Sequence, residues 1–511
     1  MSLIGVRLAV TAISVALAAV PLTAPSAAAA SPVCLSGTFQ YDYQNAEAGP
    51  GKPTVTKPLR GAGIALWGAE KSTDSPRQLT PDHQYSAADG SFNLCYTPVT
   101  TTTMNRLWVR ARSEHANLWK VDDYNANPYT LDSPTKTDTS GSASVGTVKP
   151  AGTAGRAWHA FDTVNLLWNA RSNATTGCWT TREADSNACT QLEIRWVSGS
   201  TTGAFYDLSN RVYLRDTDPD SEHMVLHESA HFFLHRLYGG WWPDVNCANH
   251  YIQLVSSGSC AWTEGFADSA AAYLLGDSRF VWPDGSSREY VYGPGWHTGD
   301  QVQGNVDASL LDLWRNLDGG WSGTIGALTS NSPSTFSQYF KTVRPAGGLS
   351  TTGTALGYLN SHAINYGPTI VGDGKNHTLT NGGGLVMDRG AACYAAGSAS
   401  VRLAASSPGS AQQTWWVRAP AADGTVKIFD GCPDSLALTA PYSAGDQVMV
   451  RAVSSSNVYQ NWRIVQNGSG TYTLTNPVTG YVLDSASIDA GAAVTTGQAS
   501  TANSQGWAAL N

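Results

Sequence analysis

Charged residues are scarce in this chain. Asp, Glu, Lys and Arg make up 14% of its 511 residues, against roughly 25% in an average soluble protein, and only nine residues are Glu. A disordered or coiled-coil protein is excluded, because aromatic residues are plentiful, with 18 Trp and 21 Tyr. Basic residues are also few, and the net charge is −8. Because nucleic-acid binding needs a basic surface, this charge argues against it. At roughly 150 residues per domain, the length predicts about three domains.

Long apolar runs are missing beyond the first thirty residues. Residues 1–30 contain Arg7, the apolar run Leu8–Val20 and a final Ala28-Ala29-Ala30, which together indicate a secretory signal peptide. The apolar run is too short for a bilayer, which needs about 20 residues in a helix. We therefore expect a secreted, extracellular protein without membrane insertion.

The eight Cys residues all lie after the predicted signal peptide, where export permits disulfides. Spacing alone does not determine the connectivity of eight Cys residues. Their order favours pairing between neighbours, which gives the pairs Cys34–Cys95, Cys178–Cys189, Cys247–Cys260 and Cys393–Cys432.

The pattern before residue 133 is typical of short strands. Gly63–Trp67 is a brief apolar run, 87–90 is a turn signal, and apolar residues alternate with polar ones over 107–112. This pattern predicts a β-sandwich over residues 31–132. The segments PLRGAGIALW, ADGSFNL and RLWVRAR resemble the prealbumin-like regulatory domains attached to secreted carboxypeptidases and adhesins. The following segment, 133–155, is rich in Ser, Thr, Gly and Pro and predicts a linker.

The C-terminal region, residues 376–511, repeats itself. Gln-x-Trp units end at Trp415, Trp462 and Trp507, with spacings of 47 and 45 residues, and such repetition indicates a repeat architecture. The units resemble the ricin-B-type β-trefoil lectins, which implies a β-trefoil with these Trp side chains in its core. The resemblance also implies glycan binding through an acidic residue early in a repeat, although the second repeat has Thr439 there. A purely structural trefoil is the alternative. The candidate sugar contacts are Asp388, Asp484 and Asn503.

One predicted helix carries the most specific motif in the chain. Asp218 suits an N-cap, Pro219 the first helical position and Gly239 the residue after the end, so we expect a helix of about twenty residues. Val225, Leu226, Phe232, Phe233 and Leu237 would supply its apolar cover.

The helix contains His227-Glu228-Ser-Ala-His231. The two His residues, four apart, share one face with Cβ atoms about 5–6 Å apart, so both imidazoles can bind one Zn²⁺. Glu228 is rotated by about 100° from His227 and can act on a water molecule at the metal as a general base. Random placement would produce this pattern about 0.004 times in a chain with eleven His and nine Glu.

The alternative interpretation is a solvated ladder of histidines. His223, His227, His231 and His235 are spaced by four residues. A spacing of four drifts by about 40° per step, so four such side chains cannot face one ion.

A catalytic zinc needs three protein ligands and one open position. The extended metzincin pattern is excluded, because Leu234 and Leu237 stand where Gly and His are required. The later segment 262–276 predicts a second helix with Glu264 and Asp268 on one face, and here the chain resembles the gluzincin metallopeptidases. The resemblance implies that Glu264 completes a His₂Glu site and that Asp268 accepts the free ring N–H of a ligand His. Glu264 as a helix cap only, and Asp268 as the third ligand, are the alternatives.

Other segments suggest parts of a cleft. Trp241-Trp242-Pro243 lies in the long insert between the two helices and suggests a rim. Arg211–Asp216 is expected to be a strand, either an ordinary structural strand or, as in zincins, an edge strand that binds an extended peptide. A donor for the oxyanion is also expected. The candidates are Tyr290, Tyr292 and His297. Residues 304–314 predict a core helix without a catalytic role.

These patterns predict a multidomain protein with an N-terminal β-sandwich, a central α+β zincin-like metallopeptidase domain over 156–367, and a C-terminal β-trefoil. The leading hypothesis is a secreted zinc metalloendopeptidase with one catalytic Zn²⁺, a protein or glycoprotein substrate, and a lectin module that binds glycans. The rival hypothesis is a carbohydrate-binding adhesin whose metal site is structural or inactive. An aminopeptidase is a variant of the first hypothesis, and a glycoside hydrolase is disfavoured because no separate carboxylate pair stands out.

Overall fold

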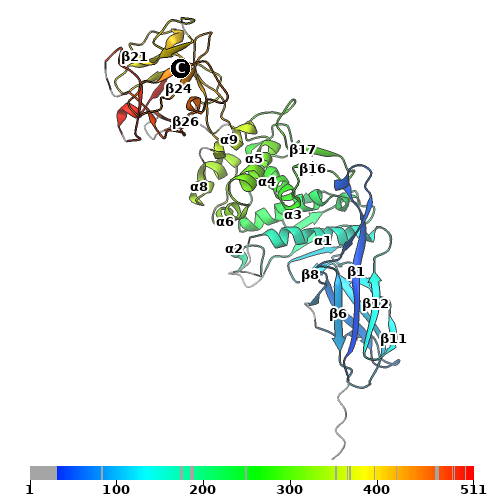
Figure 1. The fold of residues 1–511 in the computed structure, drawn as a ribbon. Helices are drawn as coiled ribbons and strands as arrows, with labels where there is room; N and C mark the ends of the chain where they lie inside the picture. Colours follow the sequence, from blue (N-terminus) through cyan, green and yellow to red (C-terminus); the bar gives the residue numbers. More distant parts are fainter. Residues whose placement is uncertain are drawn as a thin grey trace, which may run out of the picture.

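The computed structural model describes residues 31–510 except 82–83, 173–176, 185–188, 248–249, 352–353, 365, 367–369, 396, 422, 467–470, 486, 488 and 501. The predicted signal peptide, residues 1–30, lies outside the described residues. Figure 1 shows three regions along the chain: a β-rich region in blue and cyan, a helical region in green, and a second β-rich region in yellow and red. The predicted multidomain organisation is confirmed at this level.

Two sheets with a shared core form the N-terminal region. Their strands are β1 (Val33–Gln44), β2 (Thr54–Pro58), β3 (Gly63–Ala69), β4 (Arg77–Gln78), β5 (Gln84–Tyr85), β6 (Ser91–Tyr96), β7 (Met104–Arg112), β10 (Thr130–Asp132), β11 (Lys136–Thr139) and β12 (Ser142–Val148). β1 runs between β12 and β2 in the first sheet, and β7 pairs with β3 in the second. Alternate residues face the core, so Leu107, Val109 and Ala111 are buried while Arg112 is exposed.

The prediction of a linker over 133–155 was wrong. β11 and β12 lie in this segment, and β12 pairs in parallel with β1, with Cys34 opposite Ser142. β12 is at the edge of its sheet, and most of its side chains stay exposed or half-buried. An edge strand of this kind needs few apolar residues, which explains why a Ser- and Thr-rich composition is compatible with it.

The boundary predicted at residue 132 also differs from the structure. A five-stranded sheet has the order β14 (Phe205–Tyr206), β15 (Arg211–Tyr213), β13 (Leu192–Arg195), β9 (Trp119–Asp122) and β8 (Glu114–His115). β8 and β9 come from the predicted β-sandwich, yet β9 pairs in parallel with β13 of the central region. A continuous hydrophobic core runs through both regions. The N-terminal and central regions are therefore built together.

Helices cover this sheet and form the green region of Figure 1. They are α1 (Gly155–Ala170), α2 (Thr181–Ala184), α3 (Glu222–Leu237), α4 (Gly258–Leu275), α5 (Gln303–Asn316), α6 (Ser322–Ser330), α7 (Phe336–Gln338), α8 (Arg344–Ala346) and α9 (Thr354–Ser361), with the hairpin β16 (Arg279–Val281) and β17 (Ser287–Glu289). α3 packs on α1 and α4, and α4 packs on α5. α4 and α5 approach each other closely at Gly265, where an added Cβ would lie 2.8 Å from Val306 Cγ1.

The C-terminal region has its own core and three sheets, of four, five and four strands. The strands are β18 (Thr378–Thr380), β19 (Val386–Asp388), β20 (Ser398–Ser400), β21 (Arg402–Ala404), β22 (Trp415–Val417), β23 (Ile428–Asp430), β24 (Ala437–Thr439), β25 (Met449–Arg451), β26 (Arg463–Gln466), β27 (Tyr472–Thr475), β28 (Val482–Asp484), β29 (Thr495–Gly497) and β30 (Ala508–Leu510). Trp415, Trp462 and Trp507 are fully buried, and each indole N–H donates to a main-chain carbonyl one half-repeat earlier, at 2.9, 2.9 and 3.3 Å. The threefold repetition agrees with a trefoil.

The four predicted disulfides are confirmed. The structure contains Cys34–Cys95, Cys178–Cys189, Cys247–Cys260 and Cys393–Cys432. Disulfides of this number are consistent with an extracellular protein. Within the described residues, the structure contains no helix that combines the length and apolar character needed to cross a membrane.

Candidate metal centre

The helix with the motif begins later than predicted. α3 starts at Glu222, and Ser221 is its N-cap, with a hydroxyl that accepts a main-chain N–H at 3.1 Å. The prediction that Asp218 caps the helix was wrong, because Asp218–Asp220 forms a separate 3₁₀ turn and Ser221 is extended. The predicted end is confirmed, since Gly239 follows the last turn with φ of +65°.

The N-terminal region supplies a second cap to α3. Glu47 lies between β1 and β2, and its Oε1 accepts the N–H groups of Glu222 at 2.6 Å and His223 at 3.3 Å. A carboxylate at a helix N-terminus satisfies free N–H groups and complements the helix dipole. The β-rich region thus contacts the start of the helix that carries the candidate site.

α3 and α4 bring His227, His231 and Glu264 together. The Nε2 atoms of the two histidines are 3.1 Å apart, and Glu264 Oε2 lies 3.3 Å from the first and 3.4 Å from the second. The ligand-type atoms of the three residues lie within 4.8 Å of one another, and all three residues are nearly enclosed. His223 and His235, the other members of the ladder, have different partners: Glu47 and Tyr206.

Asp268, one turn after Glu264 on α4, holds one of these histidines. His227 Nδ1 lies 2.8 Å from Asp268 Oδ1. Burial lowers the pKa of His227, but the hydrogen bond and charge of Asp268 outweigh burial and raise that pKa well above its ordinary value. Burial raises the pKa of Glu264, but the charges of His231 and His227 and their hydrogen bonds lower it well below its ordinary value.

Glu228 lies beside the three-residue group on α3. It is 6% exposed and lines the cleft that also contains His227 and His231. Burial raises the pKa of its carboxyl, and the two neighbouring histidines offset this only in part. A carboxylate whose pKa is raised is a better proton acceptor, which suits a general base.

The chemistry of the group fits a zinc ion. Because His227 Nδ1 faces a carboxylate, this nitrogen carries the proton of the neutral ring, and Nε2 can then bind a metal ion. His227 Nε2, an imidazole nitrogen of His231 and a carboxylate oxygen of Glu264 converge on one point. Without a metal ion, a proton on His227 offsets the repulsion among these atoms, in agreement with its raised pKa. A metal ion would take the place of that proton, and two imidazoles with one carboxylate are a ligand set that zinc prefers.

The cleft around this group has a volume of about 810 Å³. Aromatic side chains form much of its wall. They include Trp242 from the predicted rim, Phe205 and Tyr206 from β14, Phe280 from β16, and Trp282 directly after β16. The prediction that Arg211–Asp216 could be the edge strand was wrong, because β15 lies between β13 and β14. The edge strand is β14, which turns back antiparallel to β15 and lines the cleft.

The predicted oxyanion donors lie elsewhere. Tyr290 is 3% exposed, Tyr292 is half-exposed outside the cleft lining, and His297 Nδ1 accepts the N–H of Val255 at 3.1 Å. Two residues that the sequence reasoning missed do line the cleft: His250, and Gln303 at the start of α5. No local sequence pattern indicates these positions. His250 lies in an irregular loop, and Gln303 directly precedes the core helix that was predicted over residues 304–314 without a catalytic role.

The candidate sugar contacts of the trefoil have partners in their own repeats. Asp388 accepts a hydrogen bond from Gln413 at 3.1 Å, and Asp484 accepts one from Gln505 at 2.9 Å. In the second repeat Gln460 reaches Thr439 instead, at 3.3 Å. Asn503 begins the short 3₁₀ turn of the third repeat. The first and third repeats therefore keep an acidic group that the second lacks.

Fold and site together define a multidomain protein in which a central region with a His-His-Glu group is joined to a β-trefoil. Comparison with protein families gives two consecutive matches to mycolysin: residues 34–157 match the mycolysin middle domain, and residues 171–363 match the mycolysin C-terminal domain. Residues 411–497 match the ricin-type β-trefoil lectin domain-like family. These mycolysin-type domains support a peptidase joined to a lectin module. No curated protein matches the chain.

Solved structures match about a quarter of the chain. The designed threefold-symmetric protein ThreeFoil is 26% identical, covering 27% of this chain and 98% of its own, with a TM-score of 0.24. An agglutinin from Abrus precatorius is 25% identical, covering 27% of this chain and 48% of its own, with a TM-score of 0.22. An earthworm R-type lectin C-half in complex with GalNAc is 16% identical, covering 26% and 97%, with a TM-score of 0.21. The trefoil assignment rests on the family match and on the three repeats.

Proposed function

We propose that this protein is a secreted zinc metalloendopeptidase. The observation that carries the proposal is the convergence of His227, His231 and Glu264 at one point of a large cleft, with Glu228 beside them. The mycolysin-type domains support the same conclusion at the level of a peptidase. Secretion is supported by the four disulfides and by the sequence pattern of residues 1–30.

The residues of the site have distinct proposed roles. His227, His231 and Glu264 would hold the ion, and Asp268 would keep the ring of His227 in the ligating tautomer. A zinc ion held there polarises a carbonyl group and lowers the pKa of water to about 7. Glu228 would take the proton of the attacking water and pass it to the leaving amine.

β14 supports an extended peptide as substrate. This strand ends the five-stranded sheet, pairs with β15 on one side, and lines the cleft with Phe205 and Tyr206. An edge strand offers main-chain N–H and C=O groups to which a peptide can add as a further strand. The aromatic wall suits apolar side chains of that peptide.

We further propose that the trefoil directs the enzyme to glycans, so that the substrate is a protein or glycoprotein on a glycan-rich surface. The ricin-type family match supports glycan binding, and the carboxylates of Asp388 and Asp484 are the candidate acceptors for sugar hydroxyls, with Asn503 as a further contact.

The replacement Glu228→Gln tests the catalytic role. The amide keeps the shape of the side chain but cannot accept the proton, so we expect zinc to stay bound and peptide hydrolysis to fall by about 10²–10⁴-fold. Zinc content by elemental analysis and cleavage of a peptide library measure the two effects. Glu289→Gln, an exposed residue with the same change of charge, is the matched control. Full activity of the Glu228 variant would refute the proposal.

The adhesin hypothesis makes the opposite prediction for the unmodified protein. One zinc per chain without cleavage of any peptide or protein substrate, together with glycan binding, would favour an adhesin whose metal is structural.

A further inference from the structure

The β16–β17 hairpin brings one arginine to the wall of the cleft. Phe280 on β16 lines the cleft, and its ring centroid lies 5.8 Å from that of His227. Arg288 on β17 is directly opposite Phe280 in the strand pairing. Directly opposite residues of an antiparallel pair project their side chains to the same face of the sheet, with Cβ atoms about 4.5–5.5 Å apart. Arg288 therefore lies beside the ring that contacts the candidate metal centre, and it lines the cleft as well.

The guanidinium of Arg288 is free to bind a ligand. In the described part of the chain, this side chain has no hydrogen-bond or ion-pair partner, and the residue is exposed. Glu289, its neighbour on β17, faces the other side of the hairpin, because successive side chains of a strand alternate. There it is opposite Arg279, which is itself paired with Asp277 at 2.8 Å. The charge of Arg288 is therefore available to a molecule in the cleft.

The other charged side chains of the cleft are already engaged. The acidic side chains in its described lining all lie at the candidate metal centre: Glu228, Glu264 and Asp268. Arg215 lines the cleft too, but its Nε lies 3.3 Å from Oδ1 of the buried Asp218. Of the two arginines in the described lining, only Arg288 thus lacks an acidic partner within the described residues.

We infer that Arg288 is a specificity-determining residue, which binds a carboxylate of the peptide substrate close to the scissile bond. The inference rests on the proposed function. A guanidinium presents its N–H groups as a planar fork that matches both oxygens of a carboxylate, and its positive charge disfavours a Lys or Arg side chain at the same place. An extended peptide rises about 3.3 Å per residue, so the carboxylate belongs to a residue within about two positions of the bond that is cut. An acidic side chain or the C-terminus of the peptide can supply it.

Matched peptides test which carboxylate is bound. One series has a C-terminal amide and carries Glu, Gln or Lys in turn at each of the two positions before and the two positions after the scissile bond. A second series lacks acidic residues and ends one or two residues after that bond, in a free carboxylate or in an amide. With the zinc-loaded full-length protein, we expect kcat/KM to be about tenfold higher for a carboxylate than for its neutral counterpart at one position. The series in which this preference occurs identifies the source of the carboxylate.

Replacement of Arg288 by Met and by Glu tests the residue. Arg288→Met removes the charge but keeps a long side chain, so we expect the preference for the carboxylate to vanish while neutral peptides are cleaved within about twofold of wild type. Arg288→Glu should invert the preference, so that a Lys side chain or an amide is favoured over the carboxylate. Arg451→Glu, at an exposed arginine of the trefoil, makes the same change of charge and is the matched control.

Three results would overturn the role of Arg288. An unchanged preference in Arg288→Met would assign the recognition to another residue, such as Arg215. An equal loss of activity towards charged and neutral peptides in this variant would show a merely structural role. A wild-type protein that cleaves peptides without any preference for a carboxylate would refute the inference and leave the proposed function intact. If the wild-type protein cleaves no peptide of either series or of the peptide library, the proposed function fails, and the role of Arg288 fails with it.

Discussion

Asp307 is a buried carboxyl group without a partner in the described structure. It lies on α5, is fully enclosed, and both of its carboxyl oxygens lack a hydrogen bond. Burial and the negative charge of Asp268 raise its pKa well above the ordinary value, and Arg315 offsets this only in part. The folded protein must therefore keep this residue protonated at a pH where the unfolded chain releases the proton.

The replacement Asp307→Asn should stabilise the protein increasingly as pH rises. For an acid whose folded pKa is raised, stability is fully present below the unfolded pKa, near 3.9, and is lost as pH rises towards the folded pKa. An Asn side chain does not ionise, so the variant does not lose folding stability in this way as pH rises. We expect the difference in unfolding free energy to grow by about 1.4 kcal/mol per pH unit above about pH 4, measured by thermal denaturation. A constant difference from pH 4 to 8 would contradict this, and exposed Asp446→Asn is the control.

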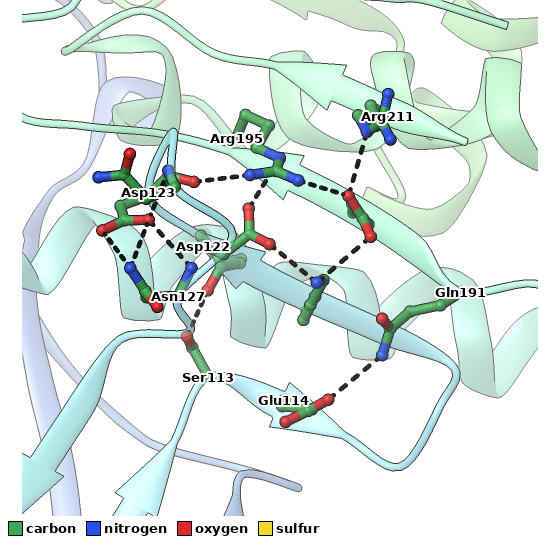
Figure 2. Close-up of polar contacts among 12 residues, drawn as sticks. Ser113, Glu114, Asp122, Asp123, Asn127, Gln191, Arg195 and Arg211 are labelled. Carbon is green, nitrogen blue, oxygen red and sulfur yellow. Dashed lines mark hydrogen bonds and ion pairs between the residues drawn. The ribbon is translucent and has the colours of Figure 1, made fainter. Parts of the chain in front are cut away.

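At the scale of elements, an ion-pair ladder joins the strands of the central sheet. Figure 2 shows Arg195 of β13 beside Asp122 of β9. Glu193 of β13 forms ion pairs with Arg195 and with Arg211 of β15. Arg195 Nε lies 3.1 Å from Asp122 Oδ1, and Arg195 Nη2 lies 2.8 Å from Glu193 Oε2. Lys120 completes the ladder at 3.0 Å from Asp122. These ion pairs lie across the pairing of β9 with β13, which joins the N-terminal and central regions.

The ladder predicts unequal effects for its two arginines. Arg195 is 10% exposed at the side chain and faces Asp122, which is fully buried, whereas Arg211 is 43% exposed. Arg195→Met should lower the free energy of unfolding by about 3 kcal/mol, because it leaves a buried charge with one partner fewer. Arg211→Met should cost less than about 1 kcal/mol. Denaturant unfolding followed by tryptophan fluorescence measures both, and equal losses would show that the ladder does not depend on burial.

At the scale of the whole molecule, the trefoil and the two preceding regions have separate cores. Among the described residues, the trefoil and the candidate metal centre share no core residue, so changes in one should leave the other intact. This separation suits a protein in which one module binds a surface and another acts on substrates.

The double replacement Asp388→Ala with Asp484→Ala should therefore abolish glycan binding without affecting peptide cleavage. We expect binding on a glycan array to fall to background, because both candidate carboxylate acceptors are removed, while peptide cleavage in solution stays within about twofold of wild type. Asp446→Ala, an exposed trefoil aspartate, is the matched control. Unchanged glycan binding would assign the sugar contacts to other residues. No binding by the wild-type protein would leave the trefoil as a structural module.

The sequence by itself determined the features that depend on local spacing. Two histidines four residues apart share a helix face wherever the helix lies, and Glu264 and Asp268 share a face for the same reason. Gln-x-Trp repetition likewise indicates the trefoil region, because the pattern is read along the chain. The order of the Cys residues favoured the four disulfides that the structure contains but did not determine them.

Only the tertiary structure decided the features that depend on contacts between distant segments. Whether a Ser- and Thr-rich segment is a linker or the edge strand β12 depends on β1, more than a hundred residues earlier. Ser221 rather than Asp218 begins α3 because the chain turns before it, and Glu47 covers its first N–H groups from another region. His250 and Gln303 meet beside Asp268 although neither lies in a motif, because side chains from a loop and two helices converge there. Local periodicity carries no information about such contacts between distant segments, because tertiary packing determines them.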